Sequence, residues 1–162
     1  MIKISKKIVA VSGGFDPIHV GHVRMILEAA NHGDVIVIAN SDEWLLRKKG
    51  YKFMTYEERQ EILYAIKGVI DVVEADDNDG TVCKTLKKVR PDIFANGGDR
   101  KGVNTPEVDL CNKLNIGLLW NVGGEKIQSS SKLVDNATNM EVQEVIGYAI
   151  GYEDGKKENS PI

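Results

Sequence analysis

The sequence has few of the residues that serve as covalent staples or membrane anchors. It has two cysteines, Cys83 and Cys111, which lie far apart and form no Cys-x-x-Cys pair, so neither a disulfide framework nor a thiolate metal site is expected. After the charged pair Lys6 and Lys7 come only four apolar residues, 8–11, too few for a signal peptide or a membrane span. We therefore expect a cytoplasmic protein with reduced thiols and no membrane partner.

An excess of positive charge is also missing. The 21 Lys and Arg residues stand against 24 Asp and Glu residues, which gives a net charge of −3. Neutralising the phosphates of a nucleic acid requires a net basic face, so no nucleic-acid partner is expected, although a local basic pocket stays possible. At 162 residues and 42% hydrophobic content, the chain suits a single domain whose core needs no metal or disulfide.

The sequence does contain a regular alternation of short apolar runs and amphipathic segments. Strands are predicted at residues 8–11, 35–39, 69–74, 92–96 and 116–120, and helices at 18–31, 56–67, 81–89, 107–114, 129–135 and 139–150. This order favours an α/β fold, a Rossmann-like doubly wound parallel sheet of about five strands in a single domain. Residues 1–150 would form that domain, and residues 151–162 a polar C-terminal tail.

Polar segments with glycine follow four of the predicted strands. In doubly wound sheets, ligands bind outside the carboxyl ends of the strands. The residues of a binding site are therefore expected in these loops, which are residues 12–22, 40–50, 96–101 and 123–132.

Two histidines, His19 and His22, lie three residues apart in the first turn of a predicted helix, directly behind Gly13 and Gly14. Side chains at this spacing share one helix face. Gly21 between them lets an anion approach the backbone, and a helix N-terminus favours phosphate. A single histidine near a helix start is usually a surface residue, but this pair behind a glycine turn favours a phosphate site.

The element His19-Val20-Gly21-His22, behind Gly14-Phe15-Asp16, resembles the HxGH signature of the nucleotidyltransferase superfamily of cytidylyltransferases and adenylyltransferases. The likeness covers roughly residues 8 to 135, through segments 40–42, 47–50, 56–59, 96–99 and 129–131. It is strongest to adenylyltransferases acting on heptose 1-phosphate, with glycerol-3-phosphate cytidylyltransferases close behind. Many members end the late serine motif with Arg or Lys, where this chain has Val134. That departure slightly favours the heptose-type group.

The resemblance implies transfer of a nucleoside monophosphate from ATP or CTP to a small phosphorylated acceptor such as a sugar phosphate, with release of pyrophosphate. It implies Mg²⁺, held mainly through the triphosphate with no certain protein ligand, and a homodimer. The implied catalytic residues are His19, His22 and Lys49, and the acceptor would contact Asp42, Arg47 and Arg59. The implied nucleotide-binding residues are Gly14, Phe15, Asp16, Gly21, Asn96, Gly98, Asp99, Arg100, Ser129, Ser130 and Ser131.

Three other functions compete with this interpretation. The imidazoles could share a zinc ion, but zinc needs three or four protein ligands and only His32 remains. A dinucleotide-dependent oxidoreductase would need Gly-x-Gly-x-x-Gly, whereas Phe15-Asp16-Pro17 follows the first glycines. A nucleotide sensor without catalysis is the third alternative, and the intact histidines and serines argue against it.

Some side chains have a structural alternative. Asp16 could cap a helix rather than orient a metal-bound water, and Arg59 could pair with Glu57 or Glu61. The two tryptophans, Trp44 and Trp120, are expected to pack rather than to stack on a base, and both cysteines are expected to be small core residues. The choice of base and of acceptor stays open.

Overall fold

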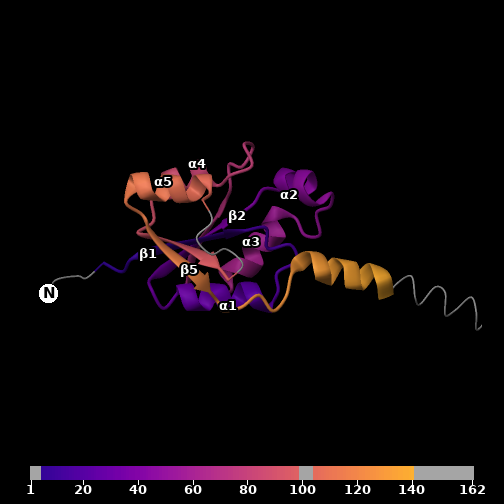
Figure 1. The fold of residues 1–162 in the computed structure, drawn as a ribbon. Coiled ribbons are helices and arrows are strands. Elements are labelled where there is room, and N and C mark those ends of the chain that lie inside the picture. The colour runs from indigo at the N-terminus through magenta and orange to yellow at the C-terminus, as the bar shows by residue number, and fades with distance from the viewer. Residues whose placement is uncertain (1–4, 99–103, 141–162) are drawn as a thin grey trace, which may run out of the picture.

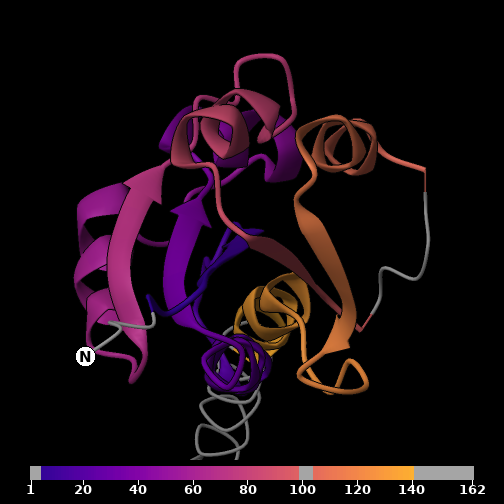
Figure 2. The ribbon, with the colours of Figure 1, turned by 90° about the vertical axis from the view of Figure 1, so that its left-hand side faces the viewer.

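A five-stranded parallel sheet organises the protein (Figures 1 and 2). The computed structural model describes residues 5–98 and 104–140. The strands are β1 (Ile8–Gly13), β2 (Asp34–Ala39), β3 (Val69–Glu74), β4 (Ile93–Gly97) and β5 (Gly117–Val122). The helices are α1 (Val20–Ala29), α2 (Asp42–Lys49), α3 (Tyr56–Tyr64), α4 (Cys83–Val89) and α5 (Pro106–Leu114), and residues 130–140 are also helical. The predicted α/β fold is confirmed.

The strand order is β3-β2-β1-β4-β5, so the chain reverses its direction of winding between β1 and β4. In β1, Val9 pairs with Val35 on one side and with Ile93 on the other. Because the connections after β1 and β4 leave in opposite directions, a crevice opens at their carboxyl ends. The fold thus places the loops that follow these two strands around one site.

Two apolar layers sandwich the sheet. In β1, Val9 and Val11 belong to the layer with α1 and α3, whereas Ala10 belongs to the layer with α4 and α5. This alternation follows from the two-residue period of a strand, and Figure 2 shows α1 and α4 on opposite faces. Cys111 is fully buried in the second layer, as predicted, and Cys83 is half-buried.

Segment 40–50 was predicted as a loop, and this prediction is wrong. It contains α2, which begins after Ser41, whose Oγ accepts a hydrogen bond from the backbone N–H of Trp44, and ends at Gly50 with a φ of 81°. Acidic residues occupy the first turn and basic residues the last, as the helix dipole favours. The start and stop signals were present, but α2 is short and mostly polar, so apolar periodicity did not reveal it.

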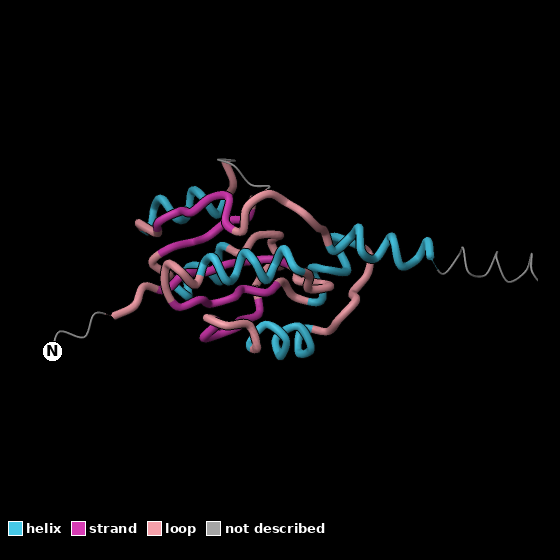
Figure 3. The backbone as a smooth tube through the Cα atoms, turned by 90° about the horizontal axis from the view of Figure 1, so that it is seen from below, coloured by secondary structure: helices cyan, strands magenta, loops and turns pink. Residues whose placement is uncertain are grey.

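The two separate helices predicted at 129–135 and 139–150 are also corrected. Residues 130–140 form one continuous helix, and Thr138 fits inside it because its hydroxyl donates to the Val134 carbonyl one turn earlier. This helix extends away from the sheet (Figure 3). The rest of segment 139–150 and the predicted tail, 151–162, lie outside the described residues. Within residues 5–98 and 104–140, every helix is too short or too polar to cross a bilayer.

Candidate active site

The two imidazoles at the start of α1 are held by the backbone around them. His19 is the N-cap, and its Nδ1 accepts a hydrogen bond from the N–H of Gly21 at 3.0 Å. His22 Nδ1 accepts from the N–H of His19 at 3.2 Å. Since each Nδ1 acts as an acceptor, the proton of each neutral ring sits on Nε2. Both rings therefore keep one N–H donor for a ligand.

The rings also support each other. The imidazoles stack with their centroids 3.8 Å apart and an angle of 24° between the ring planes. Phe15, which is buried, contacts His22 edge-on with a centroid distance of 4.9 Å. The side chains are thus oriented before any ligand arrives.

Both histidines are neutral at pH 7. Burial lowers the pKa of His22 to about 3, and the nearby His19 and Lys49 add to that effect. Burial also lowers the pKa of His19, together with the charges of Lys126 and Lys49. A neutral imidazole with its proton on Nε2 is a hydrogen-bond donor without a charge of its own, so positive charge at this site must come from elsewhere.

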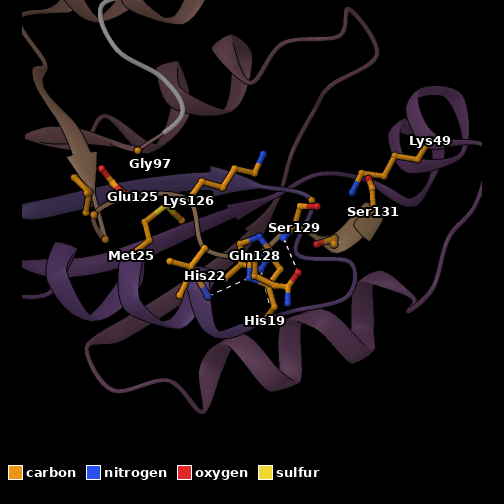
Figure 4. A pocket seen from close by; sticks show the side chains of 18 of the residues that line it. His19, His22, Met25, Lys49, Gly97, Glu125, Lys126, Gln128, Ser129 and Ser131 are labelled. Carbon is orange, nitrogen blue, oxygen red and sulfur yellow. Dashed lines mark hydrogen bonds between the residues drawn. The ribbon is translucent and has the colours of Figure 1, made fainter. Parts of the chain in front are cut away.

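A cavity of about 580 Å³ opens in front of the imidazoles (Figure 4), a volume in the range of small-molecule sites. Its walls come from the start of α1, from α2, from the loops after β4 and β5, and from the start of helix 130–140. Nine of the predicted site residues line it: Gly14, His19, Gly21, His22, Lys49, Gly98, Ser129, Ser130 and Ser131. Asn96 instead lines an adjoining cavity of about 180 Å³, whose wall also includes His22.

The late serines line the same cavity as the imidazoles, although they lie far along the chain from them. Ser130 is buried and donates from Oγ to the carbonyl of Pro17, 113 positions earlier, at 2.8 Å. Ser129 Oγ accepts from the N–H of Lys132, which caps the start of helix 130–140. The N-terminus of helix 130–140 therefore opens on the cavity and favours an anion. At the start of α1 the N–H of Gly21 is taken by His19 Nδ1 and the His19 ring covers Gly21, so the expected approach of an anion to the backbone at Gly21 is wrong.

Three lysines line the same cavity, Lys48, Lys49 and Lys126, and Glu125 is the one carboxylate among the described lining residues. Figure 4 shows Lys49 from α2 and Lys126 from the loop after β5 pointing toward each other. Burial is the main cause that lowers the pKa of Lys49. The cavity thus gathers positive charge in a chain whose net charge is −3, and it suits a ligand with several phosphates.

Three further residues line the cavity, Trp44, Lys48 and Lys126. Lys48 lies within 47–49, where a neighbour of Lys49 was an alternative phosphate clamp, whereas Trp44 was expected to pack and Lys126 was not singled out. Lys126 lies in a segment predicted to bind, but nothing in the spacing distinguished it from the other exposed lysines of the chain. Trp44 and Lys48 are one turn apart on α2, so recognising that helix would have placed them on one face.

Asp16 is fully buried and does not line the cavity. Its two oxygens accept hydrogen bonds from the backbone N–H groups of Phe53 at 2.7 Å and Met54 at 2.6 Å. The side chain fastens the loop between α2 and α3 to the loop that carries His19. Both carboxylate oxygens are therefore engaged with backbone donors.

Arg59 is also fully buried and does not line the cavity. Its guanidinium donates to the carbonyls of Gly14 and Asn40, each at 2.8 Å, and forms an ion pair with Asp42 at 2.8 Å. The alternative pairing with Glu57 or Glu61 is therefore wrong. Arg59 joins the loop after β1 to the start of α2.

The other predicted site residues fall into two groups. Arg47 donates to the carbonyl of Asp77 at 3.1 Å, so it holds α2, as Asp42 does, and neither residue lines the cavity. Asp99 and Arg100, predicted to contact the nucleotide, lie outside the described residues.

Comparison with known proteins is consistent with this geometry. The model of a family described as cytidylyltransferase-like matches residues 10–140. A FAD synthase of Ferroglobus placidus is 37% identical over 95 residues, which are 59% of this chain and 60% of that protein. A bifunctional protein HldE of Citrifermentans bemidjiense is 36% identical over 135 residues, 80% of this chain and 27% of that protein. The chain thus spans less than two thirds of either relative.

A solved structure shares the fold. It is a lipopolysaccharide core biosynthesis protein from Thermoplasma volcanium, with a TM-score of 0.59 and 25% identity, and the match covers 72% of this chain and 96% of that one.

Proposed function

Since the chain belongs to the cytidylyltransferase-like family, we propose that it is a nucleotidyltransferase, which transfers AMP from ATP to a small phosphorylated acceptor and releases pyrophosphate. The relatives favour ATP, because FAD contains AMP joined to a flavin phosphate and one relative is a FAD synthase. The sequence likeness to adenylyltransferases acting on heptose 1-phosphate points the same way, and a sugar 1-phosphate is the leading acceptor.

One observation carries this proposal. Two neutral imidazoles and the N-terminus of a second helix, distant in sequence, face a single lysine-lined cavity. In the proposed reaction an oxygen of the acceptor phosphate attacks the α-phosphorus of ATP, and the bond to pyrophosphate breaks. No covalent intermediate with the protein is required. The protein then acts by positioning the phosphates and stabilising the charge on their oxygens.

Each group has a distinct task in this mechanism. The Nε2–H groups of His19 and His22 donate hydrogen bonds to the α-phosphate, where charge develops in the transition state. The hydroxyl of Ser129 and the N–H groups at the start of helix 130–140 bind the departing pyrophosphate, while Ser130, whose hydroxyl donates to the Pro17 carbonyl, holds that helix start in place. Lys49 and Lys126 balance the negative charge from opposite sides. Losing one such donor typically raises the barrier by about 2.7–4 kcal/mol.

The donor set around the cavity suits Mg²⁺ bound mainly to the triphosphate. Mg²⁺ prefers oxygen ligands and keeps several waters, and Glu125 is the one carboxylate lining the described part of the cavity. Glu125, directly or through water, is the residue that would help to hold the ion, which supplies further neutralisation of phosphate charge. Within the described ranges, no three His, Cys, Asp or Glu residues gather as a metal-binding group.

The test is a pyrophosphate-release assay with Mg²⁺. ATP, CTP, GTP and UTP are each combined with a sugar 1-phosphate, FMN and glycerol 3-phosphate, and His22→Ala serves as the inactive control. We expect release with ATP and one of the first two acceptors. Release with CTP and glycerol 3-phosphate would favour the cytidylyltransferase alternative. A rise in Tm with nucleotide but no release with any pair would favour the sensor.

The predicted homodimer is a separate proposal. Light scattering on the eluting protein measures its mass in solution, and a mass close to 17.9 kDa would show a monomer.

A further inference from the structure

The cavity wall formed by α2 differs from the wall at α1 because it carries an aromatic ring and lysines in place of the two histidines. Trp44 and Lys48 lie one helical turn apart and both line the cavity, with Lys49 beside them. Trp44 is half-buried and is the one Trp, Tyr or Phe among the described lining residues. An indole face with an ammonium group one turn away can bind a molecule that has both a ring and polar or anionic groups.

The packing of α2 fixes which face it turns to the cavity. Leu45 is fully buried, and Asp42 is held by Arg59. At the start of the helix, Ser41 Oγ donates to Asp77 Oδ1 at 2.6 Å, and the Ser41 N–H donates to Asp77 Oδ2 at 2.9 Å. With these residues held inward, Trp44, Lys48 and Lys49 are left to line the cavity. A surface held in this way before binding loses little conformational freedom when a ligand arrives.

The end of the cavity at the loops after β4 and β5 can accommodate the base of the nucleotide. The loops after β4 and β5 line it with Gly97, Gly98, Gly123 and Gly124, and they touch, since a Cβ on Gly98 would lie 2.1 Å from the carbonyl oxygen of Gly124. This backbone-lined end, next to the apolar Met25 and Val122, suits a base. The attacking and leaving oxygens must be roughly in line at phosphorus, so an acceptor has to enter on the side of the α-phosphorus away from the pyrophosphate. Outside the glycine-lined end, the cavity wall formed by α2 carries the one aromatic ring among the described lining residues.

We propose that Trp44 and Lys48 form the acceptor subsite and that the acceptor is a phosphomonoester with a ring. The ring packs flat on the indole of Trp44, Lys48 binds a polar or anionic substituent, and Lys49 directs the phosphate toward the α-phosphorus. A sugar ring and a flat heteroaromatic ring share this chemistry, whereas an acyclic polyol phosphate offers no face to the indole. This inference rests on the nucleotidyl transfer proposed above and narrows its acceptor.

The first test uses the acceptor that supports pyrophosphate release. For Trp44→Ala we expect the KM of this acceptor to rise about tenfold, the equivalent of one lost aromatic stacking contact. The KM of ATP should change less than twofold, and Trp44→Phe should restore most of the acceptor KM. Leu46→Ala is the matched control, because Leu46 is exposed on the same helix and lies outside the cavity lining.

Lys48 is tested in the same way. Lys48→Ala should raise the acceptor KM several-fold, and Lys48→Arg should preserve it in part. Lys132→Ala is its control, since Lys132 is exposed on helix 130–140 and does not line the cavity.

The second test is spectroscopic and needs no turnover. The chain has two tryptophans, and Trp120 does not line the cavity, so Trp120→Phe leaves Trp44 as the single reporter. A sugar 1-phosphate should change the Trp44 emission in a saturable way, and bound FMN should lose its own flavin emission. ATP alone and glycerol 3-phosphate should change neither. Comparing the sugar with FMN distinguishes the two kinds of ring.

Preference for glycerol 3-phosphate, an unchanged acceptor KM in Trp44→Ala, or a Trp44 emission change with ATP alone would each overturn the acceptor subsite. These results would leave the proposed transfer intact. By contrast, saturable quenching of Trp44 by a ring phosphate without pyrophosphate release would support the subsite and refute the transfer.

Discussion

The two walls of the cavity are built in opposite ways. At the α1 wall, the hydrogen bonds that orient the imidazoles join residues two and three positions apart. At the α2 wall, the bonds that fix the helix join residues 17, 19, 36 and 45 positions apart, through Arg59 and Asp77. The first wall is a property of a short peptide segment, and the second exists only once β1, β2, β3 and α3 have come together.

This difference predicts whether a substitution should first change the catalytic chemistry or the stability of the fold. Changing a side chain at the α1 wall removes a donor from the chemistry and leaves most of the fold intact. Changing a side chain behind the α2 wall leaves buried polar groups without partners, so it should first reduce stability.

Arg59→Ala should have the largest effect on the fold. It leaves Asp42 without its guanidinium partner and the carbonyls of Gly14 and Asn40 without their donor. An unpaired buried carbonyl typically costs about 1–3 kcal/mol, so the loss of two such partners, together with the pair to the partly exposed Asp42, should lower the free energy of unfolding by about 3–5 kcal/mol. Urea denaturation measures this change, with Arg24→Ala as the control because Arg24 is exposed on α1. A loss similar to that of the control would show that Arg59 does not hold the α2 wall.

His22→Ala should have the largest effect on turnover. Removing one donor to the developing charge should lower kcat at least about a hundredfold, while the lost backbone hydrogen bond should lower the free energy of unfolding by only about 1 kcal/mol. Steady-state kinetics, the Tm and ATP binding separate these effects. His32→Ala is the control, since His32 is exposed and lies outside the cavity lining. Turnover close to wild type in His22→Ala would remove this histidine from the mechanism.

Asp77→Ala should have an intermediate effect, and it should change both the free energy of unfolding and the KM of the acceptor. It leaves Asn40 Nδ2, the Ser41 N–H and the Ser41 hydroxyl without their acceptor, which should lower the free energy of unfolding by about 1–3 kcal/mol. Because fewer hydrogen bonds then hold the N-terminus of α2 in place, the KM of the acceptor should rise more than the KM of ATP. Asp79→Ala, at an exposed position of the same loop, provides the comparison. Equal changes in both KM values would contradict a specific role of α2.

The smallest effect expected is on the pH dependence of stability. The pKa of His22 is lowered from 6.5 to about 3 in the folded protein, so between these values the unfolded chain binds more protons. Stability is therefore complete above pH 6.5 and falls as the pH drops from 6.5 toward 3. Urea midpoints at pH 7 and pH 5 should differ less in His22→Gln than in wild type. An equal difference in both proteins would show that His22 is not a buried neutral group.

Much of the fold could be predicted because its signals are periodic. The five strands occur close to the predicted bounds, since each is an apolar run whose residues face buried layers. α2 was missed because only Leu45 of its eight residues is buried, so tertiary packing and not apolar periodicity decides where it points.

The candidate site could be predicted where it depends on local order. The segment from Gly14 to His22 was recognised from its residues, and Ser129–Ser131 through their resemblance to the late serine motif of a known family. The sequence offered no way to foresee that Asp16 and Arg59 would turn away from the cavity and bind backbone groups, or that Trp44 and Lys126 would turn toward it.

The sequence by itself determined the sheet, the crevice at its carboxyl edge and the pair of imidazoles at a helix start, because these follow from the period of apolar residues and from bonds between near neighbours. Tertiary structure alone decided which polar side chains are left for a ligand. A buried carboxylate or guanidinium must find partners wherever the fold offers them, and those partners lie too far along the chain for spacing to reveal.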